Sequence, residues 1–341
     1  MPPITSSSPR TTVVGSYPVP DWLAALPSEQ ALIDATGIVF KTQELAGIDL
    51  LVDGELYRFD INHPDTNGMI DYFVRPLGGV RSAVTLADVD AFGRLQPMQF
   101  RAKPAGVVEG PVSAGTLDLV SPYERARGLT RSPLKFTVTG PHMLCRTLLD
   151  RHYKDPAALA LALADVLAAQ VARMDAEVVQ IDEANITGHP EDAEWAAAAI
   201  NRVLKAIPGE KAVHLCFGNY GGQTIQKGTW NHLVKFMNAL AADHFVLEMA
   251  RRDASEIEVL KEIKPESGIG LGVVDVKSTV VESPETIAER IERAETILGS
   301  GRVTHVHPDC GFWMLKRSVA DRKMRALVKG RDLYWGRWPS T

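Results

Sequence analysis

The chain has 341 residues, of which 45% are hydrophobic and 23% charged, and its formal net charge at pH 7 is −5. These values suit a folded protein with a large core, and the acidic balance without a Lys/Arg-rich block argues against a nucleic-acid or membrane partner. The N-terminus also lacks the pattern of a secretory signal, so we expect a cytoplasmic protein.

Short β-branched segments alternate with Ala-, Leu- and Glu-rich segments along most of the chain. This alternation predicts repeated βα units around a parallel sheet. Eight strands are expected, at residues 11–15, 49–52, 134–139, 178–181, 212–215, 245–247, 269–274 and 303–306. Eight units of this kind predict a single (β/α)₈ TIM barrel, formed as one catalytic domain by residues 1–341.

Local signals mark the ends of some helices. Asp155 and Pro156 predict the start of a helix that runs to about residue 174. Ser283 and Pro284 predict a second helix start, and Gly299 predicts the end of that helix.

The alternation of strand-like and helix-like segments is interrupted from about residue 60 to about residue 130. Possible hairpin segments lie near 69–80 and 99–113, and a short helix is expected near 117–127. We interpret this stretch as an insertion after the second strand. Residues 1–10 are expected to form a terminal tail.

Metal-binding residue types follow several of the expected strands, where TIM barrels carry their catalytic groups. His214 and Cys216 are two residues apart on one strand, so both side chains point into the barrel mouth. Glu248 follows the sixth strand and Cys310 the eighth, and together the four residues offer a nitrogen, oxygen and two-sulfur set that suits zinc. An isolated His-x-Cys pair would equally fit core packing. Cys145 lies in an apolar run and is assigned to packing.

Six motifs occur in the order found in a known family: VGSYP at 14–18, DGE at 53–55, TGP at 139–141, QIDE at 180–183, HLC at 214–216 and PDCG at 308–311. With these motifs the chain resembles the catalytic barrel of cobalamin-independent methionine synthases and their single-barrel relatives. The resemblance implies a methyltransferase that methylates the thiol of homocysteine to form methionine.

The resemblance also implies roles for individual residues. The zinc ligands would be His214, Cys216, Glu248 and Cys310, and the amino-acid thiol would be bound by Ser16, Glu55 and Asp182. In that role the carboxylates would hold the substrate ammonium group. Zinc would lower the pKa of the bound thiol, so that a thiolate attacks the methyl carbon.

The methyl donor is left open because the chain departs from folate-using members of the family. Those members have a second barrel, a tryptophan after the TGP motif and a histidine after the seventh strand, whereas here no aromatic residue occurs in 142–148 and Lys277 takes the histidine position. Methyl-folate and a methyl-corrinoid protein both remain possible donors. Possible catalytic or donor-binding residues are Lys277, Asp275, Arg146 and Asn219, and further substrate-facing candidates are Arg58, Asn62, His63 and Asp65.

Two other functions fit the same residues. One is alkylation of a different thiol, as in epoxide:coenzyme M transferase, or C–S bond cleavage, with Arg146, Lys277 or Arg251 binding an acidic substrate group. The other is a non-catalytic zinc-binding barrel that serves as a subunit. A homo-oligomer is also possible.

Overall fold

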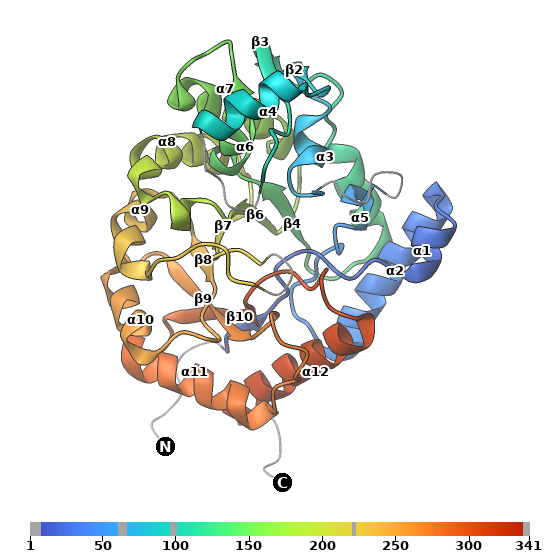
Figure 1. Ribbon diagram of the computed structural model, residues 1–341. Coiled ribbons are helices and arrows are strands. Elements are labelled where there is room, and N and C mark those ends of the chain that lie inside the picture. Colours follow the sequence, from blue (N-terminus) through green and yellow to red (C-terminus); the bar gives the residue numbers. More distant parts are fainter. Residues whose placement is uncertain (1–7, 61–66, 96–100, 220–222, 337–341) are drawn as a thin grey trace.

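The computed structural model describes residues 8–60, 67–95, 101–219 and 223–336. Its main sheet has seven strands, and every pairing between neighbours is parallel. In spatial order the strands are β1 (Arg10–Thr11), β10 (Val303–Pro308), β9 (Gly268–Val274), β8 (His244–Leu247), β7 (Glu210–Leu215), β6 (Val178–Glu183) and β4 (Lys135–Thr139). The sheet curls into a half-barrel with helices around its outer side (Figure 1).

Residues 49–52, predicted as the second strand, are represented by two isolated parallel bridges, Thr12 with Leu50 and Leu51 with Leu134. The amide side chain of Gln43 explains why residues 49–52 do not form a longer strand. It accepts a hydrogen bond from Val52 N at 3.0 Å and donates one to Val52 O at 2.6 Å, so it occupies both backbone groups of that residue. The first predicted strand is likewise short, and it begins at Arg10 within the expected tail.

The other six strands lie where the sequence predicts them, within a few residues at each end. The longer helices around the sheet are α2 (Glu29–Ala46), α7 (Pro156–Val171), α8 (Ala193–Leu204), α11 (Pro284–Leu298) and α12 (Arg317–Tyr334). The shorter ones are α1 (Asp21–Ala25), α3 (Asp71–Val74), α4 (Leu86–Leu95), α5 (Val120–Leu129), α6 (Pro141–Thr147), α9 (Val234–Ala239) and α10 (Ala254–Val259). Within the described ranges, no helix combines the length and apolar character needed to cross a bilayer.

The predicted helix caps are confirmed. The Asp155 carboxylate accepts a hydrogen bond from Ala157 N at the start of α7, and the Ser283 hydroxyl accepts one from Thr286 N at the start of α11. Gly299 ends α11 with a φ of 101°, a conformation that a side chain would strain.

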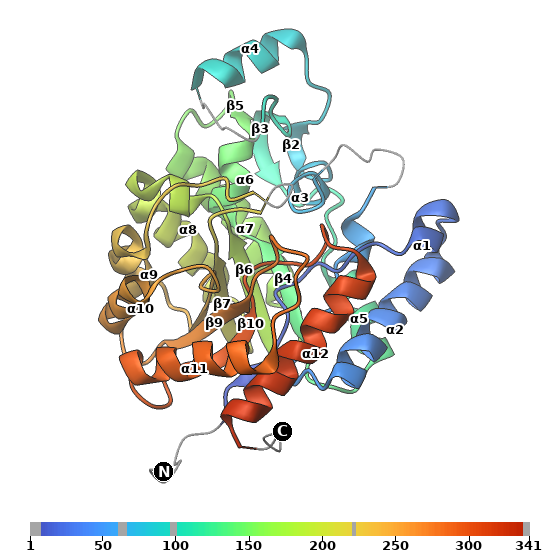
Figure 2. The same ribbon diagram turned by 60° about the horizontal axis from the view of Figure 1, so that its bottom comes forward.

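A second, three-stranded sheet lies beside the half-barrel, with α4 on its outer side (Figure 2). Its strands β2 (Gly78–Arg81) and β3 (Val107–Ser113) are antiparallel, and β5 (Leu149–Asp150) pairs with β3 in parallel. The expected hairpin therefore exists, but within the segment predicted as its first strand, 69–80, α3 occupies Asp71–Val74 and β2 begins only at Gly78. The helix expected near 117–127 is α5.

Candidate active site

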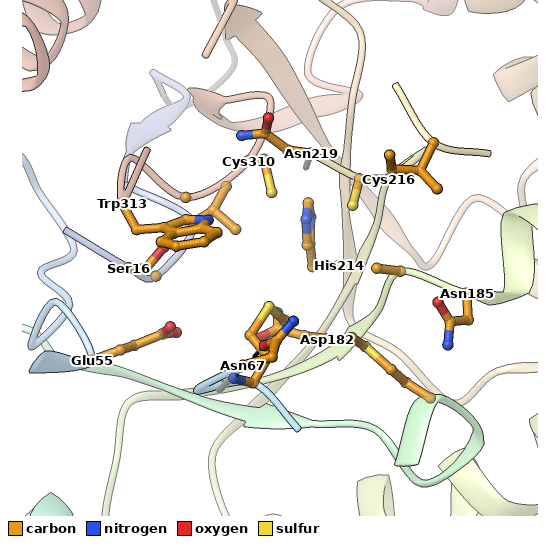
Figure 3. A pocket seen from close by; sticks show the side chains of 18 of the residues that line it. Ser16, Glu55, Asn67, Asp182, Asn185, His214, Cys216, Asn219, Cys310 and Trp313 are labelled. Carbon is orange, nitrogen blue, oxygen red and sulfur yellow. Dashed lines mark hydrogen bonds between the residues drawn. The ribbon is translucent and has the colours of Figure 1, made fainter. Parts of the chain in front are cut away.

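A pocket opens at the carboxyl ends of the parallel strands, where the sequence predicts the site. It brings together the predicted residues Ser16, Glu55, Asp182, His214, Cys216, Cys310 and Asn219 (Figure 3). These residues come from loops and strand ends, with Ser16 and Cys310 at the two extremes of the sequence, and the parallel arrangement of the strands places them at one edge.

His214, Cys216 and Cys310 form a group of candidate metal ligands, with their donor atoms all within 4.8 Å of one another. In Figure 3 the imidazole of His214 lies between the two thiols. Its Nδ1–H donates to the carbonyl oxygen of Val246 at 2.8 Å, which leaves Nε2 to act as a ligand. This Nε2 is buried and has no hydrogen-bond partner among the described residues. One imidazole nitrogen and two sulfurs in this arrangement fit zinc.

The two thiols of this group have opposite pKa shifts. The hydrogen bond from Cys216 holds the pKa of Cys310 well below its usual value, and the nearby His214 acts in the same direction. That same hydrogen bond, together with burial, raises the pKa of Cys216. Of the two thiols, Cys310 is therefore the one whose thiolate is favoured, and the thiolate is the form of cysteine that binds a metal ion.

Glu248, the fourth ligand predicted from the sequence, lies outside the group whose donor atoms are all within 4.8 Å of one another. Its Oε1 lies 2.5 Å from Nζ of Lys277, and its Oε2 accepts a hydrogen bond from Phe217 N at 3.0 Å. The carboxylate of Glu248 thus has two partners in the structure, and its role as a metal ligand stays a prediction.

Glu55 reaches the pocket from a turn in which Gly54 and Glu55 both have positive φ, 81° and 59°. Its Oε1 accepts a hydrogen bond from the Thr137 hydroxyl at 2.5 Å and lies 3.3 Å from Nη1 of Arg58. Arg58 itself is buried and donates to Thr137 O at 2.5 Å. The position of Glu55 is thus fixed by two partners before any substrate enters.

Asp182 ends a chain of buried polar side chains inside the half-barrel. Lys135 Nζ donates to Gln180 Oε1 at 2.7 Å, and Gln180 Nε2 donates to Asp182 Oδ1 at 2.7 Å. Burial raises the pKa of Asp182 to about 7, and it lowers the pKa of Lys135 to about 7. Nearby His214 opposes the shift at Asp182 and Glu55 reinforces it. Asp182 and Lys135 therefore both change their charge near neutral pH.

Two glycines allow the loops of the site to approach closely. A Cβ at Gly311 would lie 2.0 Å from Ser16 Oγ, and a Cβ at Gly15 would lie 2.2 Å from Glu55 Oε1. The loops are also tied together by a hydrogen bond from Phe312 N to Ser16 O at 2.8 Å. The glycine of the PDCG motif therefore makes room for the serine of the VGSYP motif.

The remaining predicted residues divide into two groups. Asn219 lines the pocket, and both polar atoms of its side-chain amide are buried without partners among the described residues. Arg146 lies outside the pocket and pairs with Asp192, and Asp275 accepts a hydrogen bond from Lys277 N at 2.8 Å. The candidates Asn62, His63 and Asp65 fall outside the described residues.

Several lining residues were not predicted from the sequence: Asn67, Met69, Met143, Asn185 and Trp313. Trp313 is 48% exposed and lies only three residues beyond Cys310, so the metal motif itself marks its position. Asn67 and Met69 come from the segment before α3, and no local pattern in the sequence connects them with the pocket.

Comparisons with known proteins agree with this geometry. Residues 10–331 match the family described as cobalamin-independent synthase, catalytic domain. A methionine synthase of Thermococcus kodakarensis is 28% identical over 338 residues, which cover 95% of this chain and 92% of that protein. A methionine synthase of Sulfurisphaera tokodaii is 27% identical, with 95% and 91% covered.

Solved structures show the same fold. A B12-independent methionine synthase from Shewanella sp. W3-18-1, in complex with selenomethionine, superposes with a TM-score of 0.78 at 22% identity and covers 97% of this chain and 98% of that one. A protein from Listeria monocytogenes, described as a putative vitamin-B12 independent methionine synthase, has a TM-score of 0.71 at 18% identity, with 95% and 97% covered. The resemblance expected from the six motifs is confirmed: the chain belongs to the cobalamin-independent synthase family and matches its catalytic domain along almost its whole length.

Proposed function

We propose that this protein is a zinc-dependent methyltransferase that transfers a methyl group to the thiol of homocysteine and so forms methionine. One observation carries the proposal. The donor atoms of His214, Cys216 and Cys310 lie within 4.8 Å of one another in the same pocket as the carboxylates of Glu55 and Asp182. The pocket thus combines ligands for a metal ion that would bind the thiol with two carboxylates that would bind the amino group of the same substrate.

Zinc at this site would bind the sulfur of the substrate and lower its pKa, so that the thiolate is available at neutral pH. The residues of the chain supply the rest. Glu55, fixed by Arg58 and Thr137, and Asp182, fixed by Gln180, would hold the ammonium group of homocysteine. Ser16, at the edge of the pocket, offers a hydroxyl to the same amino-acid group.

The alternative substrates, acidic thiols such as a sulfonate, fit this pocket less well. Among its described lining residues there is no lysine or arginine. Lys277 is engaged by Glu248, Arg146 by Asp192, and Arg251 is largely exposed near Asp275. A thiol with a free amino group therefore matches the charges of the pocket, and a sulfonate does not.

For the methyl donor, methyl-folate and a methyl-corrinoid protein are both retained. Trp313 supports a planar donor, because a half-exposed indole at the pocket mouth offers a face on which a heteroaromatic ring can stack. Trp313 would replace the tryptophan that follows the TGP motif in folate-using members of the family and is absent here from residues 142–148.

We further propose that residues 49–52 complete an eight-stranded barrel and that residues 1–341 act as one catalytic unit. The bridges at Leu50 and Leu51 support the first point, since they connect the two edges of the seven-stranded sheet. The family match over residues 10–331 supports the second.

Mass spectrometry of zinc-loaded protein incubated with homocysteine and a methyl donor tests the function. Methyl-folate and methylcobalamin are supplied in separate reactions, and a Cys310→Ser variant serves as the control. We expect methionine from at least one donor with the native chain and none above background with the variant. Equal methionine formation by both proteins would contradict the proposal.

A further inference from the structure

A second group of candidate metal ligands lies toward the amino ends of the parallel strands. Its members are Glu210 on β7, His244 on β8 and His305 on β10. One donor atom from each of the three residues lies within 4.8 Å of the others. Glu210 begins the strand that ends beside His214, so the group is on the opposite side of the sheet's length from the pocket. One carboxylate and two imidazoles form a ligand set that zinc and related transition metals accept in proteins.

The strand between the two histidines lets their rings meet. β9 lies between β8 and β10, and it pairs Gly268 with His244 and Gly270 with His305. Glycine has no side chain, so neither position places one between the imidazoles. The two rings stack with their centres 4.1 Å apart and their planes at 20°. Histidines from strands that are not neighbours in the sheet are thus brought into contact.

Both imidazoles are deeply buried, and each has a nitrogen that no protein group satisfies. His244 is 1% exposed and His305 is 3% exposed, and Nε2 of each ring has no hydrogen-bond partner among the described residues. Nδ1 of His244 lies 2.6 Å from Glu210 Oε1, and Nδ1 of His305 lies 3.1 Å from Thr304 Oγ1. Buried polar atoms without a partner are rare because each costs free energy. Two of them on stacked rings beside a carboxylate point to a ligand.

The carboxylate of Glu210 is available to a cation. Two basic side chains act on it, Arg10 and Lys135, and each has a closer partner of its own. Nη2 of Arg10 lies 2.7 Å from Glu177 Oε1, and Nζ of Lys135 donates to Gln180 Oε1 at 2.7 Å. The side chain of Glu210 is 32% exposed, which gives an ion a path from solvent to the buried imidazoles.

We propose that Glu210, His244 and His305 form a second metal site, the amino-end site, which binds a divalent transition-metal ion such as zinc. The ion would link β7, β8 and β10 at the end of the sheet where this fold supports stability and not chemistry. Three protein ligands leave a position that water can fill from the exposed side of Glu210. The amino-end site is independent of the proposed function, because none of its three residues lines the pocket.

A third group of candidate ligands, His189, Glu191 and Asp192, provides a comparison. Its Asp192 is already paired with Arg146 and His142, and the side chain of Glu191 is 63% exposed. This group therefore lacks the buried, unpartnered nitrogens of the amino-end site, and we expect it to hold no ion firmly.

The zinc bound per full-length chain tests the amino-end site, after equilibration with buffered free zinc and removal of unbound metal. We expect about two ions in the native chain and about one in a double-cysteine variant, Cys216→Ser with Cys310→Ser, because the amino-end site uses no sulfur ligand. Glu210→Gln and His305→Gln should each retain about one ion as well. His189→Gln is the matched control and should keep the native zinc content.

Cobalt substitution identifies the site that retains the ion. His305→Gln should keep the thiolate-to-cobalt charge-transfer band, whereas the double-cysteine variant should show only the bands of nitrogen and oxygen ligands. Circular dichroism verifies that each protein is folded. Glu210→Gln gives a second test beside His305→Gln, because its side chain is partly exposed and the substitution preserves its size.

The proposal is overturned if the double-cysteine variant retains no zinc, or if Glu210→Gln and His305→Gln both keep the native zinc content. Loss of the second ion in His189→Gln alone would assign that ion to the exposed group and would also overturn the proposal. A native chain with a single ion, lost in His305→Gln and retained in the double-cysteine variant, would support the amino-end site and refute the zinc centre of the proposed function.

Discussion

Arg58 lies directly behind Glu55, with Nη1 3.3 Å from the carboxylate oxygen Oε1 that also accepts the Thr137 hydroxyl. The guanidinium is 3% exposed, and its central carbon is 5.1 Å from the ring centre of Phe73. The Arg58 guanidinium therefore lies between Phe73 of the hydrophobic core and Glu55 of the pocket. It fixes the orientation of the carboxylate that is proposed to receive the substrate ammonium.

Replacing Arg58 by methionine should destabilise the protein, because Glu55 would be left as a buried carboxylate without its cation. We expect the free energy of unfolding to fall by about 3 kcal/mol, a typical cost of breaking a buried pair. Urea denaturation followed by circular dichroism measures the effect. A loss of less than about 1 kcal/mol would mean that Arg58 does not support Glu55.

Neutral versions of the two carboxylates test amino-group recognition. Glu55→Gln and Asp182→Asn should each weaken homocysteine binding about tenfold or more, since a charge-assisted hydrogen bond is lost. Binding of 4-mercaptobutanoate, which has the thiol and carboxylate but no amino group, should change much less. Isothermal titration of zinc-loaded protein with both thiols makes the comparison. Equal losses for both thiols would assign the carboxylates a structural role.

Adding a methyl group at Gly15 should displace the carboxylate of Glu55. In Gly15→Ala the new Cβ would lie 2.2 Å from Glu55 Oε1, and Arg58 and Thr137 prevent an easy retreat of the carboxylate. We expect a loss of about 1 to 3 kcal/mol in unfolding free energy and weaker homocysteine binding.

Gly37→Ala is the matched control for this change, because Gly37 lies within helix α2 and nothing occupies the space within 4 Å of its Cβ position. It should stabilise the protein by about 0.5 to 1 kcal/mol through helix propensity and leave homocysteine binding unchanged. If the two variants had the same effect, the close approach of Gly15 to Glu55 would be without consequence.

Asp53 should make stability depend on pH. Burial raises its pKa to about 6, although Arg58 acts in the opposite direction. A raised pKa in the folded state means that the contribution to stability is present below about pH 4 and is lost as the pH rises through about 6. Asp53→Asn removes this titration. Between pH 4 and pH 6 the unfolding free energy of the variant should therefore rise relative to native by about 2 to 3 kcal/mol, as measured by urea denaturation. A constant difference across this range would contradict the assignment.

Much of this architecture could be predicted from the sequence because strand periodicity and local caps are short-range signals. Asp155 and Ser283 cap helices as expected, and the His214 and Cys216 pair faces the pocket because alternate residues of a strand share a side. The position of Cys310 followed from the rule that parallel strands end at the same edge.

The parts that could not be predicted depend on contacts between distant side chains. Nothing near Glu248 in the sequence reveals that Lys277, 29 positions away, would take its carboxylate. In the same way, Gln43 reaches over to Val52 and shortens the second strand, and Arg146 turns to Asp192. Such pairings are decided by packing, which no periodicity in the sequence encodes.

Zinc K-edge X-ray absorption of the zinc-loaded protein with selenohomocysteine tests the central claim most directly, because selenium is distinguishable from the sulfur of Cys216 and Cys310. The account predicts a zinc–selenium contribution in the native chain, added to that of two sulfur ligands. Addition of selenohomocysteine should leave the number of zinc–sulfur contacts unchanged. A spectrum without a zinc–selenium contribution, at a substrate concentration that saturates binding, would contradict activation of the thiol by the metal.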